Sequence, residues 1–263
     1  MNYKTIIFEE KDGVATITLN RPTSFNAFNS EMIKEVVDAI EKCAKNVRIK
    51  VLIITGAGKA FCSGGDLKAA KEWAGDNRGD FFRQLTKFFH RVILDIRMMP
   101  KPVIASINGS AAGGGFSLAL ACDLRIASDK ATFRQAYTSV ALVPDGGWTF
   151  HLPKLVGLGK ASELIFLDKV LNAEEAEKLG LVNQVVSEAK LKEATLEVAK
   201  RLARGPSLAF ARAKALLNRA LTSSLESQLE NERQGIALSG ETEDFREALS
   251  AFFEKRKPKF QGK

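Results

Sequence analysis

Two glycine-rich segments, each lying between a short apolar run and an expected helix, constrain the fold of this 263-residue chain most strongly. The first is GAGKAFCSGGDL (56–67), which follows the apolar run KVLIIT (50–55). The second is NGSAAGGGFSL (108–118), which follows PVIASI (102–107). Continuous apolar runs of this length are typical of strands buried on both faces of a parallel sheet. The sequence therefore predicts two strand–loop–helix units, and this alternation favours an α/β layer fold.

Strand and helix signals continue on both sides of these units. TIIFEE (5–10) and VATITLN (14–20) predict a hairpin around KDG, because β-rich runs flank a turn signal. Further strands are expected at 123–128 and 180–186. Helices are expected over 31–46 with Ser30 as a cap, over 66–98 with a polar patch at 74–80, and over 115–122, 158–168, 173–179, 187–204, 207–222, 224–238 and 242–256.

The C-terminal part has few strand signals beyond 180–186. We therefore expect an α/β core over residues 1–200 and a helical region over 201–263. The last helix carries one apolar stripe opposite charged residues. If exposed, this stripe favours self-association. Its members are Phe245, Leu249, Phe252 and Phe253.

Charge narrows the classes of partner. The chain has 39 Lys and Arg against 31 Asp and Glu, a formal charge of +8, which suits nucleic acid, an acidic membrane surface or a polyphosphorylated small molecule. No nucleic-acid-binding signature is present, which disfavours nucleic acid. The uncharged stretch 102–122 contains Pro102 and four glycines, so strand, loop and helix are expected there rather than a membrane span.

The basic tail is interpreted either as a solvated terminus or as a phosphate contact. Its cations are Lys255, Arg256, Lys257, Lys259 and Lys263.

The three cysteines, Cys43, Cys62 and Cys122, have neither a disulfide framework nor metal-ligand spacing. The N-terminal segment has acidic residues by position 9 and no apolar core of a signal peptide. We expect a reducing, cytoplasmic location, with no metal and no redox cofactor.

Both glycine segments place a loop before a helix N-terminus, where unpaired N–H groups carry a partial positive charge. Glycine lets a ligand approach such a backbone, so two loops can direct two N–H groups at one oxygen, as in an oxyanion hole. The alternative is that the glycines, including the triplet Gly113–Gly115, serve only tight turns and close packing. Neither segment matches a P-loop or a dinucleotide fingerprint.

Six segments, in order, resemble the crotonase, or enoyl-CoA hydratase/isomerase, superfamily. The resemblance implies a spiral of repeated ββα units whose C-terminal helices build a homotrimer, often paired into a hexamer. It also implies an acyl-CoA substrate bound by the core, with the region 201–263 serving oligomerisation and CoA contact. The segments are LNRPTSFNAF (19–28), GKAFCSGGDL (58–67), KPVIASINGSAAGGGFSLALACDLRIAS (101–128), LPKLVG (152–157), AEKLGLVNQVV (176–186) and AFFEKRKPKF (251–260).

The resemblance assigns the two oxyanion-hole N–H groups to Gly65 and Gly114, which would hold the thioester carbonyl. No cofactor beyond the CoA moiety of the substrate is implied. Other residues that the resemblance places at the substrate are Lys59 and Lys68 near the nucleotide, Ser63, Gly64, Asp66 and Leu67 in the first loop, Tyr137 in the pocket, and Phe252 and Lys255 from a neighbouring subunit.

The residues that would carry the reaction differ from those of hydratases. Hydratases of the family hold water with two glutamates, and these positions are Ser117 and Tyr137 here, which disfavours hydration because an acid and a base are missing. The remaining carboxyl is Asp145 in VPDGGW, which by local sequence also suits a turn or a helix N-cap. Several isomerases of the superfamily place their working carboxylate there. The segment 136–153 most resembles the ring-epoxide isomerase of phenylacetate breakdown.

We therefore expect Asp145 to move a proton from C2 to C4 of a 3-enoyl-CoA, or to serve a related ring isomerisation. Burial would raise its pKa above about 3.9. The segment 70–95 is expected to shape the pocket. The aromatic residues that could be either pocket walls or core are Phe61, Phe116, Tyr137 and Trp148.

Three alternatives stay open. One is a hydratase with an atypical site. Another is an aryl-CoA dehalogenase in which Asp145 is the nucleophile and His90 activates water, although a histidine on an amphipathic helix is more often structural. The last is an acyl-CoA-binding member without catalysis.

Overall fold

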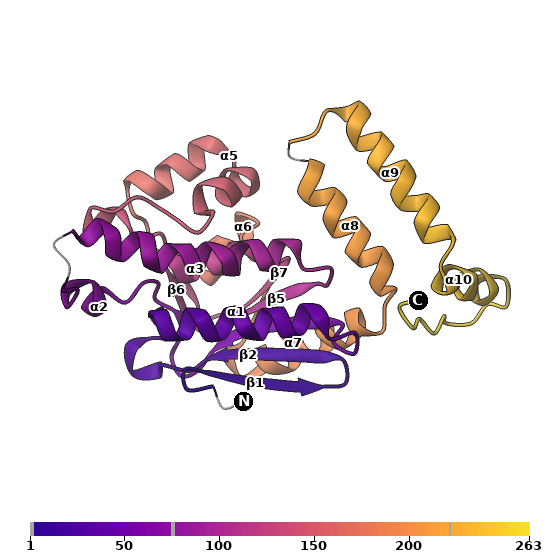
Figure 1. Ribbon diagram of the computed structural model, residues 1–263, viewed down its shortest axis with the longest axis horizontal. Coiled ribbons are helices and arrows are strands. Elements are labelled where there is room, and N and C mark those ends of the chain that lie inside the picture. Colours follow the sequence, from indigo (N-terminus) through magenta and orange to yellow (C-terminus); the bar gives the residue numbers. More distant parts are fainter. Residues whose placement is uncertain (1–2, 75–76, 221) are drawn as a thin grey trace.

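The computed structural model describes residues 3–74, 77–220 and 222–263 (Figure 1). Part of the polar patch expected at 74–80 therefore lies outside the described residues. The strands are β1 (Ile6–Lys11), β2 (Val14–Leu19), β3 (Val51–Gly56), β4 (Ala60–Cys62), β5 (Val103–Ile107), β6 (Ser110–Ala112), β7 (Leu124–Ser128), β8 (Thr132–Arg134), β9 (Leu171–Asn172) and β10 (Gln184–Val186).

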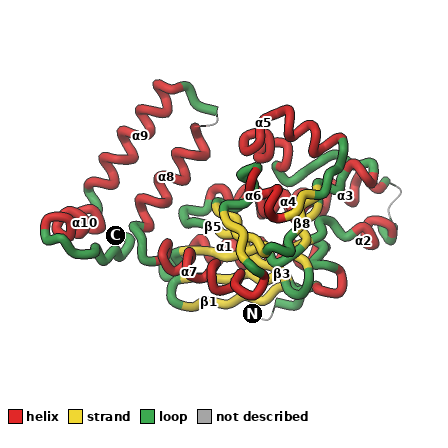
Figure 2. The backbone as a smooth tube through the Cα atoms, turned by 180° about the vertical axis from the view of Figure 1, so that it is seen from behind, coloured by secondary structure: helices red, strands yellow, loops and turns green. Residues whose placement is uncertain are grey.

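The helices fill the connections between these strands and the C-terminal part of the chain (Figure 2). They are α1 (Ser30–Lys45), α2 (Leu67–Lys71), α3 (Arg78–Met98), α4 (Gly114–Ala121), α5 (Trp148–Phe166), α6 (Ala173–Lys178), α7 (Leu191–Ala203), α8 (Ser207–Ala220), α9 (Leu225–Gly240) and α10 (Glu243–Phe253), with short 3₁₀ turns at Pro22–Ser24, Thr138–Val140 and Glu188–Lys190.

Two sheets organise the body. The larger has the strand order β1-β2-β3-β5-β7-β10 and is parallel apart from the β1–β2 hairpin. The smaller has the order β4-β6-β8-β9. Each of β3, β5 and β7 is followed by a short strand of the smaller sheet and then by at least one helix before the next strand of the larger sheet. This is the repeated ββα unit, and the expected α/β spiral is confirmed.

Side-chain alternation along β3 explains why its run is apolar throughout. Leu52 and Ile54 belong to the main core cluster, whereas Val51 and Ile53 belong to a second cluster with Leu191 of α7. Successive residues of a strand point to opposite faces. Both faces of β3 are therefore covered, with α7 against the face opposite the main core.

Several expected boundaries were wrong for local reasons. Asn29, not Ser30, caps α1, because its side chain accepts the Met32 N–H at 2.9 Å. The region 66–98 forms two helices rather than one, each with its own cap, Asp66 and Asn77. The helix expected at 158–168 begins already at Trp148, and a kink at Gly157 interrupts it.

The uncharged stretch 102–122 forms β5, β6 and α4, as expected. No helix in the part of the chain that the structure describes combines the length and the apolarity needed to cross a membrane.

The helices α8, α9 and α10 project from the body and are called the C-terminal arm (Figure 1). The arm is anchored by polar contacts: Lys214 Nζ donates to Asp123 Oδ2 at 2.6 Å and to the Ile96 carbonyl at 2.7 Å. Burial lowers the pKa of this lysine. The apolar stripe of α10 is exposed, with Phe252 at 76% and Phe253 at 74%. The division of the chain at residues 200 and 201 stays a prediction.

Candidate active site

The two glycine loops meet because β4 and β6 are parallel neighbours. Cys62 of β4 pairs with Ala111 of β6, so the residues that follow both strands leave the sheet at the same edge. The backbones touch there, since a Cβ built on Gly64 would lie 2.9 Å from the Gly114 nitrogen. Gly65 and Gly114 both line one cavity of about 260 Å³. Within the described residues, neither of their N–H groups donates to a protein acceptor.

Each glycine of the triplet has its own physical reason. Gly113 has a φ of +51°, in the left-handed region that favours glycine. A Cβ on Gly115 would lie 2.1 Å from the Cys62 carbonyl oxygen, so the close approach of α4 to β4 requires glycine there. A Cβ on Gly114 would meet Phe89 and Phe28 at an ordinary 3.4–3.5 Å. Backbone conformation therefore requires glycine at 113 and packing requires it at 115, whereas packing does not require it at 114.

The first loop is supported from below by buried polar groups. The Asn26 side chain is fully buried and donates to the Ala57 and Ala60 carbonyl oxygens at 2.9 and 2.8 Å. Cys62 Sγ accepts the Gly64 N–H at 3.4 Å, and burial raises the pKa of this thiol to about 12. A thiol that stays protonated is no nucleophile, so Cys62 has a structural role.

Asp66, expected at the substrate, is held by the protein instead. Its carboxylate accepts from Arg21 Nη2 at 2.9 Å and caps α2 through the Lys68 N–H at 3.1 Å. Asp66 is not one of the described residues that line the cavity.

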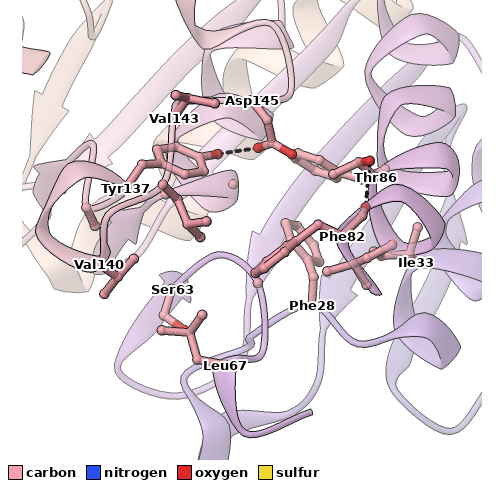
Figure 3. Close-up of a pocket in the computed structure, with 17 residues that line it drawn as sticks. Phe28, Ile33, Ser63, Leu67, Phe82, Thr86, Tyr137, Val140, Val143 and Asp145 are labelled. Carbon is pink, nitrogen blue, oxygen red and sulfur yellow. Dashed lines mark hydrogen bonds between the residues drawn. The ribbon is translucent and has the colours of Figure 1, made fainter. Parts of the chain in front are cut away.

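Asp145 lies on the opposite side of the cavity from Ser63 and Leu67 (Figure 3). Its Oδ1 accepts the Tyr137 hydroxyl proton at 2.6 Å, and its Oδ2 lies 3.9 Å from His90 Nε2. The cap of α5 is Gly147 and has no side-chain hydrogen bond. Asp145 therefore does not act as an N-cap, and its carboxyl is free to face the cavity.

Burial is the main cause of the pKa shifts of Asp145 and Tyr137. Burial raises the pKa of Asp145, while the Tyr137 hydrogen bond and the nearby His90 lower it in part. Burial and the adjacent carboxylate raise the pKa of Tyr137 far above its ordinary range, so the phenol keeps its proton and remains a donor. A carboxyl with a raised pKa, hydrogen-bonded by a neutral donor, suits proton transfer near neutral pH.

Ser117, the other position where hydratases have a glutamate, reaches the same group. Its Oγ donates to the Asp145 main-chain oxygen at 2.8 Å and lies 3.1 Å from the Tyr137 hydroxyl. Three groups from separate parts of the chain thus converge on Asp145: Ser117 from α4, Tyr137 from the loop after β8, and His90 from α3.

The rest of the cavity is apolar. Phe28 and Phe89 stack with ring centres 5.0 Å apart, and both line it. Thr86 turns its hydroxyl to the Phe82 carbonyl oxygen at 2.7 Å (Figure 3). The remaining apolar lining residues are Ile33, Leu67, Phe82, Leu85, Ala136, Val140, Leu142 and Val143.

The structure shows which of the four aromatic residues line the cavity and which belong to the core. Tyr137 lines the cavity, whereas Phe61, Phe116 and Trp148 are almost fully buried and belong to the core. Sequence reasoning missed the walls Phe28 and Phe89 as well as the loop support from Asn26. The apolar positions along 81–89 were a usable signal, since the segment 70–95 was expected to shape the pocket.

Other residues expected at the substrate do not join the cavity within this chain. Lys59, in the first glycine-rich segment, and Lys68, directly after it, are exposed, whereas Gly64 of the same segment is buried. Phe252 and Lys255 lie at the end of α10, on the C-terminal arm away from α2 (Figure 1). None of the described residues that line the cavity is a lysine or an arginine.

Comparison with known proteins gives a consistent result. A family model described as enoyl-CoA hydratase/isomerase matches residues 9–263. The 1,2-epoxyphenylacetyl-CoA isomerase of Escherichia coli is 36% identical over 98% of each chain. The 4-chlorobenzoyl coenzyme A dehalogenase-2 of an Arthrobacter species is 34% identical over 94% of this chain and 90% of its own. A crystal structure of an enoyl-CoA hydratase from Bacillus anthracis superposes with a TM-score of 0.94 at 34% identity, covering 99% of this chain and 100% of that one.

Proposed function

Because the chain belongs to the enoyl-CoA hydratase/isomerase family, we propose that it isomerises an acyl-CoA thioester by moving a carbon–carbon double bond or by a related ring isomerisation. The same carboxyl, Asp145, takes a proton from C2 and returns it at C4. The observation that carries this proposal is that Asp145 is the only carboxyl among the described residues lining the cavity that also holds Gly65 and Gly114.

The thioester carbonyl is held by the Gly65 and Gly114 N–H groups. Loss of the C2 proton leaves its electron pair in an enolate, whose oxygen these two donors stabilise. One donor of this kind contributes about 2.7–4 kcal/mol to lowering such a barrier. Both donors belong to a backbone fixed by the β4–β6 pairing, so they require no reorganisation during the reaction.

Asp145 Oδ2 is the oxygen that carries the proton, because Oδ1 is occupied by Tyr137. As the proton returns to C4, the C3–C4 double bond becomes a C2–C3 double bond and the carbonyl re-forms. The apolar walls, among them Phe28 and Phe89, keep water from the enolate. Proton count and mass are unchanged overall.

The test is mass spectrometry and ultraviolet spectroscopy of a panel of 3-enoyl-CoA thioesters incubated with the protein. Isomerisation leaves the mass unchanged and creates a conjugated thioester. A product heavier by one water indicates an atypical hydratase instead. Tight acyl-CoA binding with no turnover across the panel indicates a binding protein without catalysis.

One observation favours a second candidate, an aryl-CoA dehalogenase. His90 Nε2 lies 3.9 Å from Asp145 Oδ2, close enough for His90 to act on a group attached to that carboxyl. In that reaction Asp145 would displace halide from the ring and His90 would activate water against the resulting ester. Incubation with 4-chlorobenzoyl-CoA and measurement of chloride decides this case: release of chloride supports dehalogenation, and its absence excludes it for that substrate.

We also propose that the nucleotide end of CoA is bound between subunits. The cavity of one chain has no basic lining residue in the described part, whereas Lys255 and Phe252 are exposed on the C-terminal arm. The exposed α10 stripe supports self-association. The assembly that we propose is a homotrimer or a dimer of trimers in which this arm reaches a neighbour. Sedimentation of the purified protein tests the assembly.

A further inference from the structure

We propose that Ser117 is a positioning residue, which fixes the separation between the Gly114 N–H and the Asp145 carboxyl. This inference rests on the proposed function, in which those two groups act on one substrate. Ser117 touches no substrate in this scheme. It is fully buried, and it is not one of the described residues that line the cavity. It acts by tying the turn that carries Asp145 to the helix that begins at Gly114.

One helical turn joins the two groups. α4 begins at Gly114, and its first turn is closed by the Ser117 N–H, which donates to the Gly113 carbonyl oxygen at 3.1 Å. From that turn the Ser117 hydroxyl donates to the Asp145 main-chain oxygen at 2.8 Å. The hydrogen-bonded path from the first turn of α4 to the main chain of Asp145 therefore passes through the Ser117 side chain.

Proton counting supports this direction of the Ser117 bond. A serine and a tyrosine hydroxyl each have one proton to donate. Tyr137 donates its one hydrogen bond to Asp145 Oδ1, the shortest contact of the group at 2.6 Å. Ser117 also lies near Tyr137 Oη and the Gly113 oxygen, at 3.1 and 3.4 Å, but its shortest contact is the Asp145 oxygen. Two neighbouring hydroxyls thus hold the main chain and the side chain of one residue.

Packing explains why a small side chain stands at 117. Gly146, next to Asp145, has a φ of +59°, and a Cβ on it would lie 3.0 Å from Ser117 Cβ and 2.4 Å from the Phe89 ring. The Asp145 turn therefore rests directly on Ser117 and Phe89. Ser117 is fully buried, so a charged side chain there would have no solvent, whereas the serine hydroxyl has a hydrogen-bond acceptor in the Asp145 carbonyl oxygen.

The main chain of Asp145 is also held from two other elements. One is the loop of Tyr137, whose hydroxyl forms a hydrogen bond with the Asp145 main chain. The other is α5, where the Trp148 N–H of the first turn donates to the Asp145 carbonyl oxygen at 3.2 Å. That bond holds Asp145 to α5 but not to α4. Loss of the Ser117 hydroxyl therefore removes the hydrogen bond between this turn and α4 and leaves the bond to α5 in place.

The test compares Ser117→Ala with Ser106→Ala. Ser106 is likewise buried and bonds Thr195 Oγ1 at 3.0 Å, on the α7 side of the large sheet away from the cavity, so its variant controls for the loss of a buried hydroxyl. In crystal structures of both variants, we expect the Asp145 turn to shift away from α4 by about 0.5 Å or more only in Ser117→Ala, a displacement large enough to disturb catalysis. An unmoved turn in Ser117→Ala overturns the proposal.

Steady-state kinetics distinguish a positioning role from a purely structural one, because only the positioning role predicts a fall in kcat at constant KM. With a 3-enoyl-CoA that the wild type isomerises, Ser117→Ala should lower kcat about 10- to 100-fold while KM stays within about twofold, because misplacement affects the transition state. Ser106→Ala should leave both unchanged. Unaltered kcat in Ser117→Ala also contradicts the positioning role. Activity that survives Asp145→Asn contradicts the proposed function instead, and the crystallographic comparison then still decides the role of Ser117.

Discussion

The Tyr137 hydroxyl donates to Asp145 Oδ1 at 2.6 Å, which leaves Oδ2 as the oxygen next to the cavity and 3.9 Å from His90. The two carboxylate oxygens are thus unequal before any substrate arrives. In the proposed reaction, Oδ1 orients the carboxyl and Oδ2 carries the proton. This division underlies the predictions for Asp145 and Tyr137.

Replacing Asp145 with asparagine should abolish isomerisation, by about 10³-fold or more, because general acid–base catalysis contributes on this scale. Acyl-CoA affinity should stay close to that of the wild type, since the amide keeps an oxygen for Tyr137. Turnover assays and calorimetric titration with a CoA thioester measure the two quantities. Wild-type turnover in the variant would contradict the assigned role.

The same variant should be more stable than the wild type at neutral pH. Burial raises the folded-state pKa of Asp145, so its contribution to stability is present below the unfolded value of about 3.9 and is lost as pH rises through the folded value. Thermal unfolding should therefore show a higher Tm for Asp145→Asn at pH 7 and no such difference near pH 3. Equal Tm values at pH 7 would count against burial as the cause of the shift.

Tyr137→Phe should move the acidic limb of the kcat/KM profile to higher pH. The Tyr137 hydrogen bond lowers the pKa of Asp145, so its removal lets burial raise that pKa further, and a higher pH is then needed to ionise the base. The only other tyrosine provides the control: Tyr3 bonds Asp38 at 2.6 Å, on α1. Tyr3→Phe should leave the profile in place, and a profile equally unmoved in Tyr137→Phe would contradict the assignment.

Two neighbouring glycine substitutions should differ sharply. Gly115→Ala places a Cβ 2.1 Å from the Cys62 carbonyl oxygen and should cost about 1–3 kcal/mol of unfolding free energy or more. Gly114→Ala meets only ordinary contacts at 3.4–3.5 Å and should stay within about 1 kcal/mol of the wild type. Denaturant titration of both variants checks the contrast. Similar losses at the two positions would show that the packing explanation of the triplet is wrong.

Lys255→Glu should weaken acyl-CoA binding, and the loss should shrink as salt is added, because exposed charges are screened. The matched control is Lys200→Glu, an exposed lysine on α7, the helix against the opposite face of the large sheet. Titrations at low and high salt with the assembled protein give the comparison. An unchanged dissociation constant at both salt concentrations would remove Lys255 from the CoA site.

Much of the fold could be predicted from local residues, because β3 and β5 are apolar on both faces and glycine punctuates the segments that follow them. The short strands β4, β6, β8 and β9 could not, since strands of two or three residues have no measurable periodicity. The start of α5 was also hidden, because Gly147, Pro153 and Gly157 suggest a loop there while packing around the buried Trp148 imposes helix.

The site, too, could be predicted only in part from the sequence. Gly65, Gly114, Tyr137 and Asp145 were selected from the sequence, and the structure places all of them on one cavity. Phe28 and Phe89 were not, because an aromatic residue on a helix or in a loop gives no local sign of whether it lines a cavity or fills the core. That distinction depends on which elements meet, as the parallel pairing of β4 and β6 illustrates.

Because of this strand pairing, binding of the substrate carbonyl and the choice of reaction depend on different parts of the chain. In the proposed reaction, the substrate carbonyl is held by backbone that the smaller sheet positions, whereas the side chains that act on the substrate or orient these groups, at 90, 117, 137 and 145, lie outside both sheets. A few exchanges at those positions can redirect the chemistry while the thioester stays anchored. The relatives that share about a third of their residues with this chain are named isomerase, hydratase and dehalogenase. Such a range of activities is expected when exchanges at a few side chains change the reaction on one scaffold.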